Sequence, residues 1–261
     1  MTGEYEDGPV DDEKFALQDT EYSFPYHYLP HIDPASGVGM VARRLGRGLE
    51  YLTYLLHCRD LVADLGPTSL LDVGCGDGRF LGLFGGLVDR RVGLDLSENA
   101  IRFATAFNPN ADIRVASSID EQFDIVTAIE VLEHVPPDEA DGFIRNLVRS
   151  VRPGGHIVIS VPTVNARLQR KHYRHFTLET LIDAVQGPEP SLSLQSSEFL
   201  ATSQPDTLTR VATLASGNRY WKFDFLPLQT FLWNRTWQRR VSTPDRGRHL
   251  VTIWRKAASS V

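Results

Sequence analysis

Cysteine, long apolar runs and positive charge are all scarce in this sequence, and each scarcity excludes a class of protein. Cys58 and Cys75 are the only cysteines among 261 residues. They are too few for a disulfide framework, so we expect free thiols and a cytoplasmic location. No apolar run approaches the roughly 18 residues of a membrane span. The stretch from Met1 to Val10 is acidic and has no apolar core, unlike a secretory signal.

The charge is unevenly distributed along the chain. The formal net charge of −6 argues against binding of nucleic acid over the whole surface. Residues 1–30 carry eight acidic side chains and one lysine, whereas residues 211–261 carry nine basic side chains and two aspartates. Such an asymmetry can mark an anionic partner at the basic end, or it can reflect two solvated surfaces. The sequence leaves both interpretations open.

Residues 1–68 are interpreted as an appendage to the core. Residues 1–20 are acidic with almost no apolar pattern, so they are expected to be disordered. Residues 22–31 are dense in aromatics and proline, which excludes a regular helix and predicts an extended arm. Leucines at helical spacing then predict a long amphipathic helix, which ends at Gly66 and Pro67.

From residue 69 onward, short apolar strands alternate with amphipathic helices. This order predicts a parallel sheet with helices on both faces. We therefore expect an α/β fold built on a doubly wound, Rossmann-like, mostly parallel sheet of seven strands. The predicted strands are 69–73, 91–95, 113–116, 123–129, 156–161, 193–200 and 250–254, and the predicted helices among them are 80–87, 99–107 and 140–151.

A glycine-rich loop, within the string LDVGCGDGRF at residues 71–80, follows the first predicted strand and opens a helix. Its glycines let the chain turn tightly and let a ligand approach the backbone. The GxGxG spacing differs from the GxGxxG of dinucleotide sites, and the carboxylate of Asp72 would repel a pyrophosphate. A ligand that carries positive charge suits it better. Asp95 ends the second strand, where an acid can accept hydrogen bonds from both ribose hydroxyls.

Together these motifs resemble those of the class I S-adenosylmethionine-dependent methyltransferases. The resemblance covers residues 69–161. It includes the string FDIV at residues 123–126 and the Pro-Gly-Gly turn at residues 153–155, which precedes the fifth strand in that family. The resemblance implies that S-adenosylmethionine is the cofactor and that the protein is an enzyme.

The resemblance also implies roles for single residues. Asp72 is expected near the amino group of the cofactor, Asp95 at its ribose, and Leu96 against its adenine. Many relatives place an aspartate after the third strand to bind the adenine amino group, whereas this chain has Ser117 there. The hydroxyl of Ser117 or a backbone group would then have to bind the adenine amino group. In the alternative, Ser117 only shapes the turn. The other residues expected at the cofactor are Gly74, Cys75, Gly76, Gly78 and Glu130.

A second group of chemically active residue types follows the fourth predicted strand. If a helical turn starts at Glu130, then Glu130, Glu133 and His134 share one face. They would lie at the carboxyl edge of the sheet, where α/β proteins bind ligands. The Glu-x-x-Glu-His string resembles those of ubiquinone-biosynthesis O-methyltransferases and small-RNA 2′-O-methyltransferases, two groups that use a metal. A later histidine completes the site in the RNA group, and His172 matches it by its distance to Thr177.

Three interpretations of this group are open. In the first, Glu130, Glu133, His134 and His172 bind one Mg²⁺, Mn²⁺ or Zn²⁺, which would lower the pKa of a bound hydroxyl. In the second, His134 with Glu133 acts as a general base without a metal. In the third, these residues are structural and Glu130 contacts the cofactor. His175 is expected to be a surface histidine rather than a ligand.

Further boundaries follow from the aromatic-rich segments. We expect the core to occupy residues 69–204, an insertion or lid to occupy 205–248, and the final core strand to lie in 249–261. The arm and this insertion are predicted to close over the methyl acceptor, unless they only pack loose segments onto the domain. Removal of residues 1–33 is then expected to spare cofactor binding and to reduce turnover. Residues 226–240 combine tryptophan with arginine, which fits a packed lid helix or a peripheral membrane contact.

The sequence thus predicts methyl transfer to the hydroxyl of a small-molecule, sugar or lipid-linked acceptor. An RNA or tRNA methyltransferase is the first alternative, and it would need a basic groove beside the cofactor. A catalytically inactive cofactor-binding protein is the second. Neither the identity of the acceptor nor the oligomeric state follows from the sequence.

Overall fold

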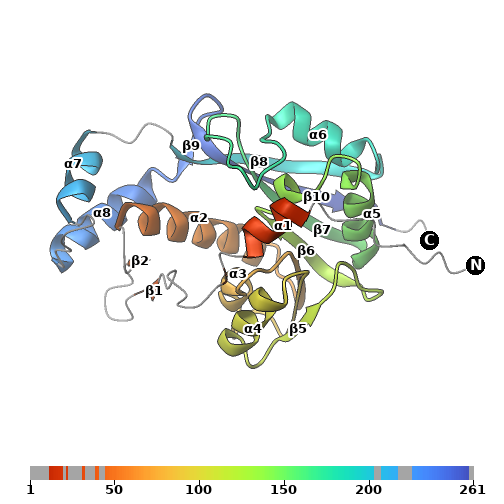
Figure 1. Cartoon of the computed structure of the whole chain (residues 1–261). Coiled ribbons are helices and arrows are strands. Elements are labelled where there is room, and N and C mark those ends of the chain that lie inside the picture. Colours follow the sequence, from red (N-terminus) through yellow and green to blue (C-terminus); the bar gives the residue numbers. More distant parts are fainter. Residues whose placement is uncertain are drawn as a thin grey trace, which may run out of the picture.

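A mixed sheet of eight strands forms the centre of the protein. The computed structural model describes residues 12–19, 22, 31–32, 39–40, 45–202, 207–216 and 225–258. Across the sheet the strands lie in the order β5-β4-β3-β6-β7-β10-β8-β9 (Figure 1). Their bounds are β3 Ser69–Val73, β4 Arg90–Asp95, β5 Asp112–Val115, β6 Phe123–Ile129, β7 Val151–Pro162, β8 Leu192–Thr202, β9 Val241–Ser242 and β10 Gly247–Lys256.

The parallel part of the sheet contains the point at which ligands bind in folds of this type. β3 lies at its centre and pairs with β4 on one side and β6 on the other, and β5 and β7 extend these two directions. The strand order therefore reverses between β3 and β6, and open sheets of this type bind ligands at the carboxyl ends of the strands beside such a reversal. β10 runs antiparallel between β7 and β8, and its residue His249 pairs with Pro162. His249 therefore lies at the same edge of the sheet.

Helices cover both faces of the sheet because the strands are apolar on both sides. Successive residues alternate between two hydrophobic clusters: Leu71 and Ile157 belong to one, Leu70 and Val158 to the other. α5 and α6 complete the first cluster, and α2 and α3 complete the second. The helix bounds are α1 Asp12–Asp19, α2 Leu45–Ala63, α3 Arg79–Gly82, α4 Glu98–Phe107, α5 Ala140–Ser150, α6 Leu178–Gln186, α7 Thr207–Ser216 and α8 Leu226–Gln238.

The structure corrects three expectations about the elements. The sheet has eight strands rather than seven, because the two-residue strand β9 pairs with β8 beyond the expected edge. Residues 12–19 form α1 instead of being disordered, since α1 bonds to loops of the core. α3 ends at Gly82 instead of extending to residue 87, and Gly86 takes a positive φ of 78° after it. The predicted arm at 22–31 lies outside the described residues except for Tyr22 and His31.

The C-terminal insertion contributes two helices. α8 packs against α2, while residues 217–224 between α7 and α8 lie outside the described residues. Of the aromatic side chains expected to clamp an acceptor, Trp233 and Trp237 stack with 6.2 Å between their ring centroids. Phe225 and Phe231 are exposed, so an aromatic clamp is not confirmed. Within the described part of the chain, no helix is both long and apolar enough to cross a membrane.

Candidate active site

The glycine loop between β3 and α3 is tied to the neighbouring strand. The amides of Gly74 and Cys75 both donate to the carbonyl of Leu94, at 2.7 and 2.8 Å. The side chain of Cys75 is buried, and its sulfur lies 3.0 Å from the point where a Cβ on Gly93 would stand. Cys75 therefore packs its side chain inward and offers only its backbone to the loop.

All three glycines of this loop adopt backbone conformations that other residues take with strain. Gly74 has a φ of 72°, Gly76 a φ of 55° and Gly78 a φ of 72°. A Cβ on Gly78 would stand 2.4 Å from the amide nitrogen of Asn108, which donates to the carbonyls of Gly78 and Ala104 at 3.0 Å each. Asn108 thus holds the loop to the end of α4. The sequence predicts a helix that ends at residue 107, just before Asn108, but this tertiary role of Asn108 leaves no local signal.

Asp95 connects the end of β4 to the loop. One carboxylate oxygen accepts from the amide of Gly76 at 2.9 Å, and the other accepts from the amide of Ser97 at 2.8 Å. Burial raises the pKa of Asp95, although these amides oppose the shift. Each oxygen keeps a second lone pair for a ligand hydroxyl. Beside it, Leu96 is 50% exposed despite its apolar side chain, and Ser117 is exposed at the end of β5.

Asp72 lies under the loop and is almost inaccessible to solvent. Its side chain accepts a hydrogen bond of 2.7 Å from the hydroxyl of Thr127 on β6. Burial raises the pKa of Asp72 to about 7, even though the Thr127 hydrogen bond favours the ionised form, and the charge of Asp95 adds to the rise. A buried carboxylate with such a pKa is stabilised by any cation that comes to rest beside it.

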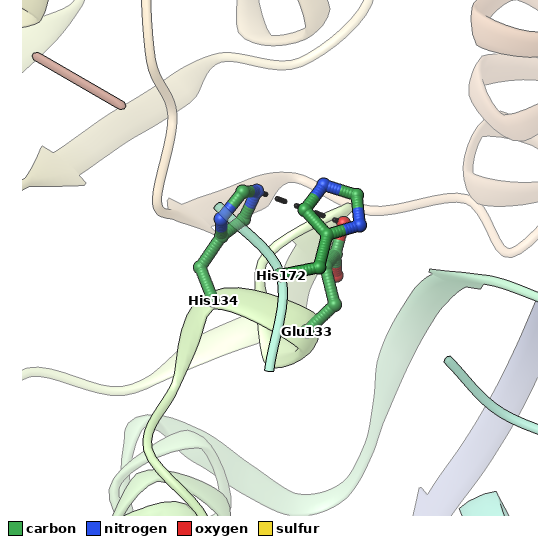
Figure 2. A group of neighbouring side chains, drawn as sticks. All are labelled: Glu133, His134 and His172. Atoms are coloured by element: carbon green, nitrogen blue, oxygen red, sulfur yellow. Dashed lines mark ion pairs between the residues drawn. The ribbon is translucent and has the colours of Figure 1, made fainter. Parts of the chain in front are cut away.

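Glu133, His134 and His172 form a compact cluster at the same edge of the sheet. Each offers a ligand atom, and these atoms all lie within 4.8 Å of one another. Figure 2 shows the three side chains converging, with a dashed line between His134 and Glu133, whose nitrogen and oxygen are 3.8 Å apart. The rings of His134 and His172 meet edge to face, with 4.7 Å between their centroids. The sequence predicted all three residues, and the fold brings them together across 38 residues of chain.

Backbone contacts hold the cluster in place. Glu133 and His134 belong to a short 3-10 helix, η2 (Leu132–His134), that follows β6. The carbonyl of Glu133 accepts from the amide of Tyr173 at 2.8 Å, and Nδ1 of His134 donates to the carbonyl of Lys171 at 3.2 Å. The segment that carries His172 is therefore fixed to η2 by hydrogen bonds on both sides of the cluster.

The side chain of Glu133 is the most unusual member of the cluster. It is 1% exposed, and neither carboxylate oxygen has a hydrogen-bond partner. Burial raises the pKa of Glu133 well above its ordinary value, and the negative charge of Glu130 raises it further. The pKa of His172 moves the other way, to about 3, because burial and the neighbouring histidines disfavour the charged ring. A neutral imidazole next to an unpartnered carboxylate is a donor set that lacks a cation.

Glu130 corrects the predicted helical turn. It has a left-handed backbone with a φ of 57°, so it precedes η2 instead of sharing a helical face with Glu133 and His134. Its carboxylate accepts from Ser160 at 2.9 Å, from Tyr54 at 3.3 Å and from Nδ1 of His249 at 3.1 Å. Among the described residues, the group of ligand atoms within 4.8 Å does not include Glu130. Its predicted contact with the cofactor stays a prediction.

His249 is a charged partner of Glu130 that the sequence did not indicate. Burial alone would lower the pKa of His249, but the charges and hydrogen bonds of Glu130 and Glu50 raise it to about 10. Contact with His249 in turn keeps the pKa of Glu130 below its ordinary value although burial opposes this. Because the three residues come from α2, β6 and β10, no sequence spacing connects them. The carboxylate of Glu130 is therefore one partner of an ion pair with His249.

α1 spans the edge of the sheet between the two halves of the site (Figure 1). At one end, the carboxylate of Asp19 accepts from the hydroxyl of Ser97 and from the amide of Asn99, the latter at 2.8 Å. At the other end, the ammonium group of Lys14 donates to the carbonyls of Arg170 and His172, at 2.8 and 3.3 Å. α1 thus joins the loop after Asp95 to the segment that carries His172.

A comparison with known families identifies the family of this chain. The family described as a methyltransferase domain matches residues 49–196, which is more than half of the chain. The chain belongs to the class I methyltransferases. The predicted class of S-adenosylmethionine-dependent enzyme is confirmed by this family, whereas the comparisons lend no support to the predicted divalent metal. The glycine loop and Asp95 lie within the matched residues.

Curated relatives carry one recurring name. The chain is 30% identical over 159 residues to a ubiquinone biosynthesis O-methyltransferase of Hydrogenovibrio crunogenus, an alignment that covers 56% of this chain and 61% of the relative. It is 34% identical over 116 residues to the protein of the same name from Pseudomonas putida strain GB-1, covering 40% and 47%. The chain thus spans about half to three fifths of the length of these relatives.

Solved structures share the fold at lower identity. A S-adenosylmethionine-dependent methyltransferase from Mesorhizobium loti superposes with a TM-score of 0.53 at 20% identity, covering 80% of this chain and 100% of the other. One from Archaeoglobus fulgidus gives 0.53 at 19% identity, covering 80% and 96%. These likenesses show the Rossmann-like methyltransferase fold.

The pKa of Asp72 predicts how cofactor affinity depends on pH. An ammonium group beside Asp72 stabilises its ionised form, so binding releases a proton wherever the free protein holds Asp72 protonated. Affinity should then rise with pH, by up to about tenfold for each unit below 7, and level off above 7. Calorimetry with S-adenosylhomocysteine between pH 5.5 and 7.5 measures this. Asp72→Asn should bind more weakly and lose the dependence, whereas the same slope in that variant would exclude Asp72 as the cause.

Asp19 tests whether α1 closes over the cofactor. Ser97, which it binds, also donates its amide to Asp95, so Asp19→Ala should loosen the ribose-binding loop. We expect affinity for S-adenosylhomocysteine to fall by up to about thirtyfold, as two hydrogen bonds of roughly 1 kcal/mol each are lost. The control is Glu13→Ala on the same helix, whose ion pair with Arg170 is largely exposed and worth little. Equal affinities in both variants would show that α1 does not contribute to cofactor binding. That outcome would agree with the expectation from the sequence that removal of residues 1–33 spares cofactor binding.

Proposed function

We propose that this enzyme methylates a hydroxyl oxygen of a small-molecule, sugar or lipid-linked acceptor. The observation that carries the proposal is the cluster of Glu133, His134 and His172 at the edge where the glycine loop ends. Amines are nucleophilic once neutral, whereas a hydroxyl needs help to lose its proton, since even a phenol has a pKa of about 10. The name O-methyltransferase on the curated relatives supports the same acceptor atom.

The cluster fits a divalent cation, which we propose as part of the site. Both oxygens of Glu133 are buried without a hydrogen-bond partner, and a cation would satisfy them. Because Nδ1 of His134 donates to a carbonyl, its Nε2 is the nitrogen that carries the lone pair. Three protein ligands leave positions open for an acceptor. Two imidazoles with one carboxylate favour Zn²⁺ or Mn²⁺ over Mg²⁺, which prefers oxygen ligands. Glu130 is not part of this proposal because His249 already pairs with it.

Each group of residues then has a defined task. S-adenosylmethionine supplies an activated methyl group, which passes to the acceptor oxygen by direct displacement. Asp72 would bind the amino group of the cofactor and Asp95 its ribose, so the methyl group between them would be held beside the cluster. Glu133, His134 and His172 would hold a divalent cation, which would lower the pKa of the acceptor hydroxyl when bound. In the alternative without an ion, Nε2 of His134 takes the proton itself.

The proposal is tested by an acceptor screen with methyl-labelled cofactor. The panel contains catechols with and without an apolar tail, sugars, aliphatic and aromatic amines, and an RNA oligonucleotide. We expect label on the oxygen of at least one hydroxyl compound, located by mass spectrometry of the product. Label on amines alone would overturn the proposal, label on the oligonucleotide alone would support the RNA alternative, and no transfer to any acceptor with intact cofactor binding would support an inactive protein.

A further inference from the structure

His175, which the proposed function does not use, is bonded directly to the cluster. Its Nε2 lies 2.8 Å from Nδ1 of His172, and its own Nδ1 lies 3.1 Å from the carbonyl oxygen of Ala166. The two rings have 5.1 Å between their centroids. His175 is half-buried rather than a free surface residue. Three groups therefore form a chain of hydrogen bonds that ends on the backbone at one side and on the cluster at the other.

Hydrogen-bond accounting fixes where the protons of this chain lie. A carbonyl oxygen only accepts, so the proton of a neutral His175 is on Nδ1 and points at Ala166. Nε2 of His175 is then an acceptor, and the proton between the two rings belongs to Nδ1 of His172. A neutral imidazole has one N–H, which leaves Nε2 of His172 with the lone pair. His172 thus has its acceptor nitrogen available to the cluster before any ligand arrives.

We propose that His175 is a positioning residue that fixes the tautomer and the ring orientation of His172, so that Nε2 of His172 is presented to the cluster as a ligand nitrogen. The inference deepens the proposed function, and its value for cation binding rests on that proposal. Metal-binding histidines generally donate their second nitrogen to an oriented acceptor, and loss of that acceptor typically costs 10- to 100-fold in affinity. Here the acceptor is a second imidazole, which the carbonyl of Ala166 holds in the accepting tautomer.

The geometry also explains the spacing of the two histidines. His172 and His175 are three residues apart in a segment that lies between the end of β7 and α6. The isolated bridge from Thr163 to Phe176 and the hydrogen bond from the Phe176 amide to Pro162 fix the end of this segment. Ala166 lies in the first part of the same loop. The loop therefore closes on itself through His175, and this closure positions His172 under α1.

The tautomer is measured directly in the full chain without metal or acceptor. Long-range ¹H–¹⁵N spectra of histidine-labelled protein at pH 8 separate protonated from unprotonated ring nitrogens, and a His172→Gln variant assigns the signals. We expect both His172 and His175 to carry their protons on Nδ1. In His175→Phe, the bonded acceptor is lost and His172 should shift toward the Nε2–H tautomer that free histidine favours. In His175→Gln, the side-chain carbonyl can accept again and Nδ1–H should be retained. An Nε2–H tautomer of His172 in the wild type would overturn the inference.

Calorimetry with Zn²⁺ or Mn²⁺ gives a second readout that does not depend on turnover. We expect affinity for the ion to fall about 10- to 100-fold in His175→Phe and by only a few-fold in His175→Gln. Binding of S-adenosylhomocysteine, unchanged in both, shows that the variants are folded. If the wild type binds no ion while its His172 tautomer depends on His175, the proposal of a bound cation is refuted and the positioning role of His175 is supported. If the wild type binds an ion and His175→Phe binds it equally well with an unchanged tautomer, the positioning role of His175 is refuted and the proposal of a bound cation is supported.

Discussion

Replacement of Gly76 by valine is expected to abolish binding of S-adenosylmethionine. Gly76 has a φ of 55°, which a β-branched residue adopts only with strain. A Cβ there would stand 2.7 Å from the hydroxyl oxygen of Tyr22. The amide of Gly76 also donates to Asp95, so a shift of the backbone would disturb the carboxylate that we predict to bind the ribose. Calorimetry with S-adenosylhomocysteine should show no measurable binding.

Gly86 provides the matched control for this prediction. It has a φ of 78°, and a Cβ added there would meet no atom within 4 Å. Gly86→Val therefore carries a similar backbone strain away from the cofactor loop, and it should lower the unfolding temperature while leaving cofactor affinity intact. Asp95→Ala should fall between the two, about 1–3 kcal/mol weaker in binding, because charged hydrogen bonds are lost. Tight binding of S-adenosylhomocysteine by Gly76→Val would contradict the assignment of the glycine loop to the cofactor site.

Removal of divalent metal is expected to lower turnover by orders of magnitude and leave cofactor binding unaffected. The reason is the unpartnered carboxylate of Glu133 beside the imidazoles of His134 and His172, a donor set that a cation would complete. Dialysis against EDTA should remove activity, and added Zn²⁺ or Mn²⁺ should restore it. Glu133→Gln, His134→Ala and His172→Ala should each cause a comparable loss, because a site of three ligands fails when one is missing.

His156 is the control histidine for these variants. It lies in the middle of β7, where it pairs with Ile125, and not at the carboxyl end of the strand that leads to the cluster. His156→Gln should keep full activity and the same response to EDTA. Full activity of the wild type in EDTA, with no ion in elemental analysis, would contradict the metal. If His134→Ala is then severe and His172→Ala mild, His134 is the general base.

Much of the fold was predictable because its signals are local. The strand at 69–73 and the strand at 123–129 match β3 and β6, since short apolar runs bounded by turn residues indicate buried parallel strands. The predicted helix at 99–107 agrees with α4 to within one residue. Its bounds were predictable because Ser97 caps its start and Asn108 ends it. The number of strands was wrong by one, because β9 has two residues and exists only by pairing with β8.

The candidate site likewise contains some residues whose place was predictable from local signals and others whose place was not. Asp72 and Asp95 lie at the ends of β3 and β4, and the glycine loop follows β3. Their place at the carboxyl edge was therefore predictable from the order of elements alone. Glu133, His134 and His172 were predicted by residue type and by resemblance, and the structure brings them together. The predicted helical turn from Glu130 was wrong, because a left-handed residue ends β6 and directs the carboxylate to Ser160, Tyr54 and His249.

The sequence by itself determined the α/β class, the position of the cofactor loop and the residue types available for chemistry, because each of these depends on spacing within one element or one turn. Only the tertiary structure decided which side chains share protons. His249 reaches Glu130 from an antiparallel strand, Asp19 reaches Ser97 from an N-terminal helix, and His175 bonds His172 within a loop closed by distant contacts. Hydrogen bonds and burial act over a few ångströms in space, and separation along the chain does not encode that distance.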